Sequence, residues 1–182
     1  MQINKTKIEG CFELIPKVFE DERGHFFESF NQSKFEKETG AKPFFVQDNQ
    51  SLSTRGVLRG LHFQTGIHAQ AKLVRVLEGE VLDVAVDLRP DSKTYRSIVR
   101  TVLSSENKKQ LFIPRGCAHG FVTLSETATF FYKCDNFYNK ASEGGVLYSD
   151  PVLNIDWILD DKDLLVSEKD SILPTLNEFV AN

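Results

Sequence analysis

The sequence is poor in cysteine and in long apolar runs. Only three cysteines occur in 182 residues, an odd number without metal-like spacing, which excludes a disulfide-stapled scaffold. We expect Cys11, Cys117 and Cys134 to be packing residues. No apolar run approaches the roughly 18 residues that a membrane-spanning helix needs. The opening segment MQINKTKIEG lacks the apolar core of a signal peptide, so we expect a cytoplasmic protein with reduced thiols.

Neither charge sign predominates, because 22 Lys and Arg face 26 Asp and Glu, a net charge of -4. Binding to nucleic acid or to a membrane is therefore not expected, and any anionic ligand must be held by local charge. With only 6 prolines and 41% hydrophobic residues, disorder and collagen are excluded. The length suits one domain over residues 1–182.

Short alternating or aromatic-rich runs, separated by turn-forming segments, predict an all-β sandwich or barrel. The expected strands are residues 11–19, 25–30, 44–51, 57–64, 72–77, 80–89, 96–103, 110–114, 119–124 and 128–138. In residues 80–89, apolar Leu82 and Val84 alternate with Asp83 and Asp87. This period of two predicts a strand with one core face and one wetter face.

Helices are expected at only two places. Asn31 can cap a helix over residues 32–39 and Gly40 can end it, and a second helix can begin near Ser167 and be limited by Pro174. The strands before residue 50 are extra to a minimal barrel and can pair with a second subunit, so we expect a homodimer.

Two of the four histidines, His62 and His119, stand in β-like segments beside glycine and charge. A single histidine there would be interpreted as a core or surface residue. The spacing from Gly56 to His62, and from Pro114-x-Gly116 to His119, resembles the two motifs of the cupin barrel.

In metal-binding cupins the first motif continues with a second histidine and a carboxylate, which fall here at Gln64 and Lys72. A cation would repel a divalent metal, and two histidines are too few ligands, so no metal is expected. Lys72 is interpreted as an electrophile or anion binder inside the cavity, with an exposed strand-end lysine as the alternative.

Four motifs, RGLHFQ, AQAKLVRVLEGEVLDVAVDLR, IPRGCAHGF and YKCDNFY…EGG, carry a closer similarity. Through them the sequence resembles the dTDP-4-dehydrorhamnose 3,5-epimerases from about Phe12 to Asp170. The resemblance implies a cupin-like jelly-roll barrel with N-terminal extra strands and a few short helices. It also implies a cofactor-free enzyme acting on a dTDP-4-keto-6-deoxy sugar, in which the C4 ketone acidifies the hydrogens on C3 and C5.

The resemblance assigns four residues to proton transfer. His62 is the base, Asp170 orients its imidazole, Tyr132 donates a proton on the opposite face of the sugar, and Lys72 neutralises charge on O4. Imidazole suits the base because it is largely neutral at cytoplasmic pH. From the residues alone, Tyr132 would be a packing residue and Asp170 a solvated helix residue.

The resemblance also implies a set of substrate-binding residues. Arg23 and Arg59 match phosphate contacts, with His119 nearby, and arginine suits bidentate oxyanion binding. The remaining positions comprise the nucleotide contacts, the cleft-lining aromatic and the thymine-stacking aromatic, which are Glu28, Gln47, Asn49, Glu143, Lys169, Phe26 and Tyr138. Residues from the N-terminal strands of one subunit are expected to complete the partner's nucleotide site.

Two departures from the family pattern lie near these positions. The loop after Gln64 reads TGIHA where prolines are usual, and its His68 is interpreted as structural or exposed. Cys117 stands where a larger apolar residue is frequent.

The alternatives to a double epimerase are a single-centre epimerase, a 4-keto sugar isomerase and a catalytically silent sugar-nucleotide-binding cupin. A metal-dependent cupin oxygenase is disfavoured by Gln64 and Lys72.

Overall fold

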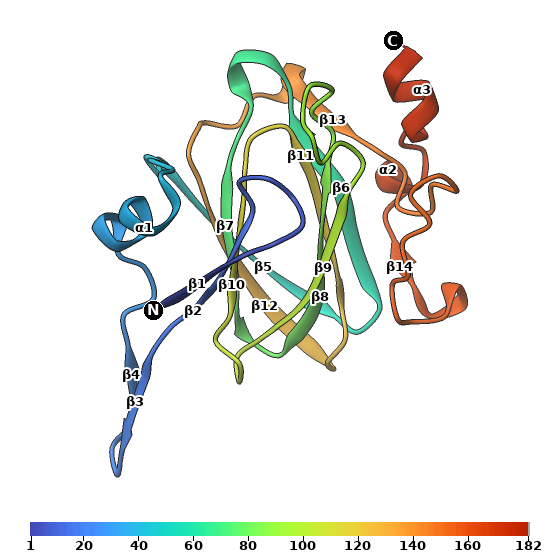
Figure 1. Ribbon diagram of the computed structural model, residues 1–182. Coiled ribbons are helices and arrows are strands. Elements are labelled where there is room, and N and C mark those ends of the chain that lie inside the picture. Colours follow the sequence, from blue (N-terminus) through green and yellow to red (C-terminus); the bar gives the residue numbers. More distant parts are fainter. Residues whose placement is uncertain (182) are drawn as a thin grey trace.

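Two β-sheets face each other in the computed structural model, which describes residues 1–181 (Figure 1). In spatial order, one sheet consists of β1 (Gln2–Lys5), β2 (Phe12–Ile15), β10 (Gln110–Ile113), β7 (Lys72–Glu78), β12 (Thr127–Cys134) and β5 (Gln47–Thr54). The other consists of β13 (Glu143–Gly145), β6 (Val57–Gln64), β11 (Cys117–Thr123), β8 (Glu80–Asp87) and β9 (Ile98–Ser104), with β14 (Leu165–Val166) pairing parallel to β6. The all-β jelly-roll prediction is confirmed, and Asn182 of the predicted domain lies outside the described residues.

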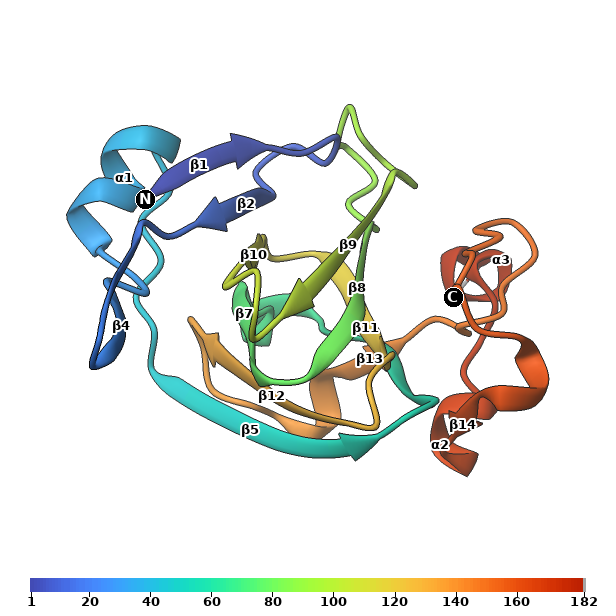
Figure 2. The same cartoon turned by 90° about the horizontal axis from the view of Figure 1, so that it is seen from below.

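Seen along the barrel, the strands surround a central space (Figure 2). Helix α1 (Gln32–Thr39) and the N-terminal strands lie on one side, whereas α2 (Glu168–Ser171) and α3 (Leu176–Ala181) lie on the other. A separate hairpin of β3 (Val18–Asp21) and β4 (Gly24–Phe27) projects from the barrel. No helix of the described chain is long and apolar enough to cross a membrane.

The predicted helix-capping residues Asn31, Gly40 and Ser167 are confirmed. The Asn31 side chain accepts the backbone N–H of Lys34 at 3.0 Å, and Gly40 ends α1 in the left-handed conformation, with φ of 76°. Ser167 caps α2 by accepting the N–H of Asp170 at 3.1 Å. These contacts satisfy backbone groups that a helix end leaves unpaired.

The strand predictions differ from the structure mainly before residue 50. The run 11–19 is two strands, because it is broken at Pro16, which cannot donate a backbone hydrogen bond. Strand β1 was not expected, since its sequence QINK is short and mostly polar. Residues 57–64 form β6 as predicted.

Strand β8 contradicts the prediction of a wetter face, because both of its faces are covered. Leu82 and Val84 pack outward against the C-terminal segment through Trp157, which the sequence pattern did not reveal as a cover. Asp83 and Asp87 point to the barrel interior and are 0% exposed. The interior of the barrel therefore contains carboxylates.

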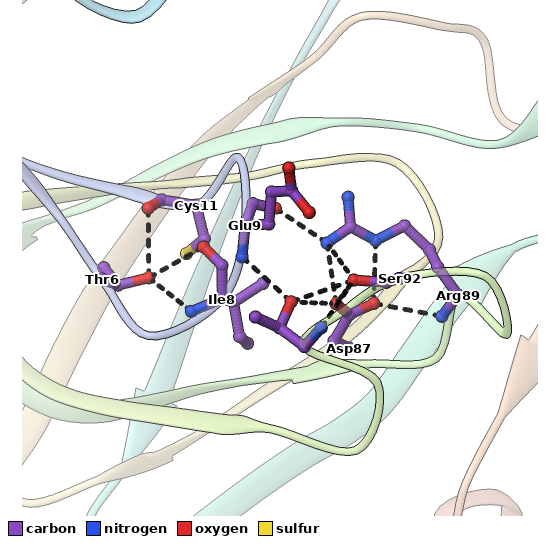
Figure 3. Close-up of polar contacts among 8 residues, drawn as sticks. Thr6, Ile8, Glu9, Cys11, Asp87, Arg89 and Ser92 are labelled. Atoms are coloured by element: carbon purple, nitrogen blue, oxygen red, sulfur yellow. Dashed lines mark hydrogen bonds and ion pairs between the residues drawn. The ribbon is translucent and has the colours of Figure 1, made fainter.

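The Asp87 carboxylate is part of a network of polar contacts (Figure 3). Its Oδ2 atom accepts hydrogen bonds from Arg89 at 2.7 Å, Ser92 at 2.6 Å and Thr94 at 2.6 Å. The same Arg89 guanidinium donates to the carbonyl of Glu9 at 2.7 Å, and the Glu9 N–H donates to Thr94 at 3.0 Å. This network fastens the loop before β2 to the connection between β8 and β9.

Candidate active site

A cavity of about 440 Å³ opens between the two sheets and contains the predicted proton-transfer residues. It is lined from one sheet by His62 and His119 and from the other by Lys72 and Tyr132, with Asp170 at its edge. An adjoining hollow of about 290 Å³ shares His62, Lys72 and Tyr132. A larger hollow of about 530 Å³ lies between β1 and β9, but no histidine, cysteine or tyrosine lines it. The cavity that contains His62 and Tyr132 is therefore the candidate active site.

His62, on β6, is held by a carboxylate from α2. The distance from its Nε2 to Asp170 Oδ1 is 2.7 Å, and Asp170 Oδ2 accepts the N–H of Gly60 at 3.2 Å. Burial raises the pKa of Asp170, but the hydrogen bond and charge of His62 outweigh burial, and the net pKa lies below the ordinary value. Because a carboxylate only accepts, His62 Nε2 carries a proton, and in a neutral ring Nδ1 keeps its lone pair.

Glycine at position 60 allows β6 and β11 to approach closely. A Cβ on Gly60 would lie 2.6 Å from Gly120 Cα and 2.7 Å from the carbonyl oxygen of His119, and the φ of Gly60 is 125°. A side chain would therefore push the strands apart and strain the backbone. This approach makes His62 and His119 direct register partners.

Lys72 and Tyr132 project from neighbouring strands of the opposite sheet. The Lys72 ammonium lies 5.9 Å from the centre of the Tyr132 ring. Among the described residues, neither polar tip has a hydrogen-bond partner, and neither is sealed from solvent. Burial lowers the pKa of Lys72, opposed by the charges of Cys134, Asp83 and Glu143, and burial raises the pKa of Tyr132. The alternative of an exposed strand-end lysine is wrong.

His119 is the most deeply buried histidine of the cavity, with 7% exposure. Its Nε2 lies 2.9 Å from Oδ2 of Asp83, which is fully buried on β8. The sequence interpretation missed Asp83 because it placed this residue on a wetter face. The motif EVLDVAVD, with carboxylates among near-continuous apolar residues, was the available signal.

The cavity mouth contains most of the predicted binding residues. Lys169 of α2 contacts Glu143 of β13 at 2.6 Å, and the Tyr138 hydroxyl donates to the same carboxylate at 3.0 Å. Gln47 and Asn49 of β5 bond to each other at 3.0 Å. Arg59, Gln47, Asn49, Tyr138, Glu143 and Lys169 all line one or both hollows.

Three predicted binding residues are not in this cavity. Arg23 and Phe26 line a separate hollow on the β3–β4 hairpin, where the Arg23 side chain is 85% exposed and paired with Asp21. Glu28 pairs with Lys34 at 2.7 Å, beside α1. Within one chain, therefore, the cavity and its adjoining hollow are together lined by eleven of the fourteen predicted site residues.

The donor set of the cavity suits proton transfer rather than metal binding. Gln64 accepts the N–H of Asn139 at 2.9 Å, so its side-chain oxygen is used in the fold. No cluster of three or more His, Cys, Asp or Glu side chains that could hold a metal occurs in residues 1–181. The three cysteines are buried and unpaired, as expected for packing residues.

The fold and the site define a cupin-like barrel whose cavity places the Asp170-bonded His62 of one sheet opposite Tyr132 and Lys72 of the other. A family model described as dTDP-4-dehydrorhamnose 3,5-epimerase matches residues 5–178. The chain belongs to the dTDP-4-dehydrorhamnose 3,5-epimerase family.

Individual relatives can be aligned with this chain over nearly its full length. The chain is 53% identical over 178 residues to the dTDP-4-dehydrorhamnose 3,5-epimerase of Salmonella typhimurium, covering 98% of this chain and 97% of that one. The crystal structure of the Elizabethkingia anophelis enzyme of the same name is 56% identical, with a TM-score of 0.95 and 97% coverage of both chains. The Legionella pneumophila 3,5-epimerase in complex with dTDP-4-keto-L-rhamnose is 48% identical, with a TM-score of 0.92 and coverage of 97% and 93%.

Proposed function

We propose that His62, Tyr132, Lys72 and Asp170 carry out the reaction that gives the family its name. The enzyme converts dTDP-4-dehydro-6-deoxy-D-glucose to dTDP-4-dehydro-L-rhamnose in dTDP-L-rhamnose biosynthesis. The observation that supports these roles best is the placement of His62 and Tyr132 on opposite sheets across one cavity. A sugar ring between the sheets has one face toward a base and the other toward an acid.

His62 removes the protons. In the neutral ring, the Nε2–H bond to Asp170 leaves Nδ1 with its lone pair, and Nδ1 takes a proton from the carbon beside the ketone. The Asp170 carboxylate then stabilises the imidazolium that forms, as an aspartate does in hydrolase triads. The Gly60 N–H and the Ser167 cap hold Asp170 in place while this charge appears.

Lys72 stabilises the enolate. Removal of a proton next to the ketone transfers negative charge to O4. The Lys72 ammonium has no hydrogen-bond or ion-pair partner among the described residues, so it can face that oxygen directly. Burial in the cavity strengthens the attraction because the effective dielectric there is low.

Tyr132 returns a proton from the opposite face. Burial raises its pKa, so the hydroxyl stays protonated until the substrate accepts the proton. Delivery from the side opposite His62 inverts the carbon. Once His62 has released its proton to solvent and Tyr132 has taken one up, the same pair of residues acts on the second carbon, and inversion at C5 and C3 gives a double epimerisation.

The nucleotide occupies the cavity mouth. Arg59 contacts the diphosphate, while Tyr138 stacks on the thymine ring and Gln47, Asn49, Glu143 and Lys169 make the remaining contacts. Arg59 and Lys169 supply local positive charge in a chain of net charge -4.

A second copy of the chain completes the site. The hairpin that contains Arg23 and Phe26 projects away from its own barrel (Figure 1). Two of its aromatic residues are largely exposed to solvent, Phe26 at 71% and Phe19 at 54%. Exposed aromatics on a projecting hairpin are typical of an intersubunit contact. We propose a homodimer in which this hairpin, with Glu28, reaches the partner's cavity. A cytoplasmic location is part of the same proposal.

The experiment that tests these roles compares wild-type protein with the His62→Asn and Tyr132→Phe variants, using NMR to identify the sugar product. The proposal expects dTDP-4-dehydro-L-rhamnose from the wild type alone. Wild-type turnover by either variant would refute its assigned role. Inversion at C3 or C5 alone would instead identify a single-centre epimerase.

A further inference from the structure

In the second histidine–aspartate pair of the cavity, the histidine donates the hydrogen bond and the aspartate accepts it. His119 Nε2 lies 2.9 Å from Asp83 Oδ2, and Asp83 is 0% exposed. The carboxylate offers no proton, so Nε2 donates and, in a neutral ring, Nδ1 is left as a lone-pair acceptor. Among the residues that the structure describes, Asp83 makes no other side-chain hydrogen bond, and its Oδ1 is sealed from solvent without a partner.

The Nδ1 atom of His119 reaches the cavity. It has no hydrogen-bond partner among the described residues. The only side-chain polar atoms of the described residues that are both sealed and partnerless are Asp83 Oδ1 and Thr123 Oγ1. Nδ1 therefore keeps access to the cavity that His119 lines, and a bound ligand can meet it.

The surroundings keep the His119 ring neutral. Asp83 faces it from β8, His62 from β6 and Lys72 from β7, while the Phe130 ring of β12 stacks on it at 6.0 Å. Burial lowers the pKa of His119, and the charges of Lys72 and His62 lower it further against the opposing effect of Asp83. Within the cavity, Lys72 thus presents a cationic donor and His119 a neutral acceptor.

We infer that Asp83 is a positioning residue that fixes the Nε2–H form of His119, so that Nδ1 accepts a hydrogen bond from a ring hydroxyl of the sugar. A ketone or ether oxygen cannot donate, so this acceptor distinguishes hydroxylated sugars from deoxy sugars. In a 4-keto-6-deoxyhexose bound through its diphosphate, the available hydroxyls are those on C2 and C3. The inference rests on the proposed function, which supplies this sugar.

The experiment measures deuterium uptake from D2O, as kcat/KM, with the dTDP-4-keto-6-deoxy sugar and with its 2-deoxy and 3-deoxy analogues. Wild-type protein is expected to lose about 10- to 100-fold with the analogue that lacks the contacted hydroxyl, because a polar group of the site is left unpaired. The other analogue shows a smaller loss and so identifies which carbon bears the contacted hydroxyl. Equal rates with all three sugars would overturn the inference.

Variants separate positioning from general disruption. In Asp83→Leu the acceptor for Nε2–H is gone, so the penalty for the missing hydroxyl should fall to within about 3-fold, whatever happens to the absolute rate. Thr123→Val, which removes the other sealed and partnerless polar atom, is the matched control and should keep the full penalty. A purely structural Asp83 would lower kcat/KM equally for all three sugars, and that result would refute the positioning role.

A spectroscopic measurement needs no variant to fold. Nitrogen-15 chemical shifts of the wild-type imidazoles at neutral pH should show His119 protonated at Nε2 alone. An Nδ1–H tautomer or an imidazolium would overturn the inference. If wild-type protein takes up no deuterium from any of the sugars, the proposed function fails, whereas normal uptake without hydroxyl discrimination refutes only the role of Asp83 and His119.

Discussion

His62 and His119 lie opposite each other as register partners on β6 and β11, and each bonds through Nε2 to its own aspartate. The two rings differ in access, since the His62 side chain is 32% exposed and that of His119 is 7% exposed. The same bonding pattern leaves the Nδ1 atoms of both rings for the one cavity, where we propose His62 as the base and His119 as a hydrogen-bond acceptor beside it.

Replacement of the base should abolish turnover while leaving the fold intact. His62→Asn is expected to lower kcat by at least about 100-fold, because general base catalysis contributes that much or more. The assay is product formation by NMR, with dTDP binding measured by calorimetry to establish an intact site. His68→Asn, in the loop beyond β6, is the matched control and should retain wild-type turnover.

Removal of the Tyr132 hydroxyl should uncouple proton removal from inversion. Tyr132→Phe keeps the ring against Phe130 but lacks the donor, so product formation should fall about 100-fold or more while exchange through His62 persists. The measurement is the ratio of deuterium uptake to product formed. Tyr148→Phe, on the outer face of the second sheet, should leave this ratio unchanged. Full epimerisation by Tyr132→Phe would exclude it as the donor.

Mixing two inactive variants tests the shared site. If the β3–β4 hairpin serves the partner, subunits with Arg23→Ala and subunits with His62→Asn should form heterodimers that contain one intact site. After unfolding and refolding together in equal amounts, about a quarter of wild-type activity should return, because half of random dimers are mixed. Mixing His62→Asn with the double variant Arg23→Ala/His62→Asn should restore none. Absence of recovery in the first mixture would mean that the hairpin does not serve the partner's site.

The Asp87 network should make stability depend on acid (Figure 3). Burial alone would raise the pKa of Asp87, but hydrogen bonds from Arg89, Ser92 and Thr94 hold it well below the ordinary value. A depressed pKa stabilises the fold fully above the unfolded value of about 3.9, and this stability is lost as pH falls toward the folded pKa. Asp87→Asn should therefore cost about 3 kcal/mol in the free energy of unfolding at pH 7.

Urea unfolding at several pH values measures this effect. The difference between wild type and Asp87→Asn should shrink below about pH 4, because Asp87 of the unfolded wild-type chain takes up a proton there while the folded chain keeps its carboxylate ionised. A difference that stays constant to pH 2 would contradict the assignment. Asp91→Asn, an exposed carboxyl in the same connection, is the matched control.

The sequence predicted elements best where local chemistry decides them. Asn31 and Gly40 mark the ends of α1 because each satisfies backbone groups by itself. Residues 57–64 alternate and end at turns, and they form β6. The short strand β1 depends on pairing with β2, which itself pairs with the distant strand β10, and periodicity does not report such pairing.

The site was predictable through the resemblance and only partly from the residues. Asp170 looked like a solvated helix residue, yet it is buried because α2 packs on β6 and brings its carboxylate to His62. Asp83 looked like a solvent-facing strand residue. It faces the barrel interior instead, because the apolar face of β8 packs outward against the C-terminal segment. In both cases tertiary contacts from another part of the chain decided burial.

The most direct test of the account is incubation of the wild-type protein with dTDP-4-dehydro-6-deoxy-D-glucose in D2O, with deuterium read separately at C3 and C5. Proton transfer between His62 and Tyr132 across the cavity predicts deuterium and inversion at both carbons, giving dTDP-4-dehydro-L-rhamnose. An intact protein that binds dTDP but leaves both carbons protonated and uninverted would contradict it.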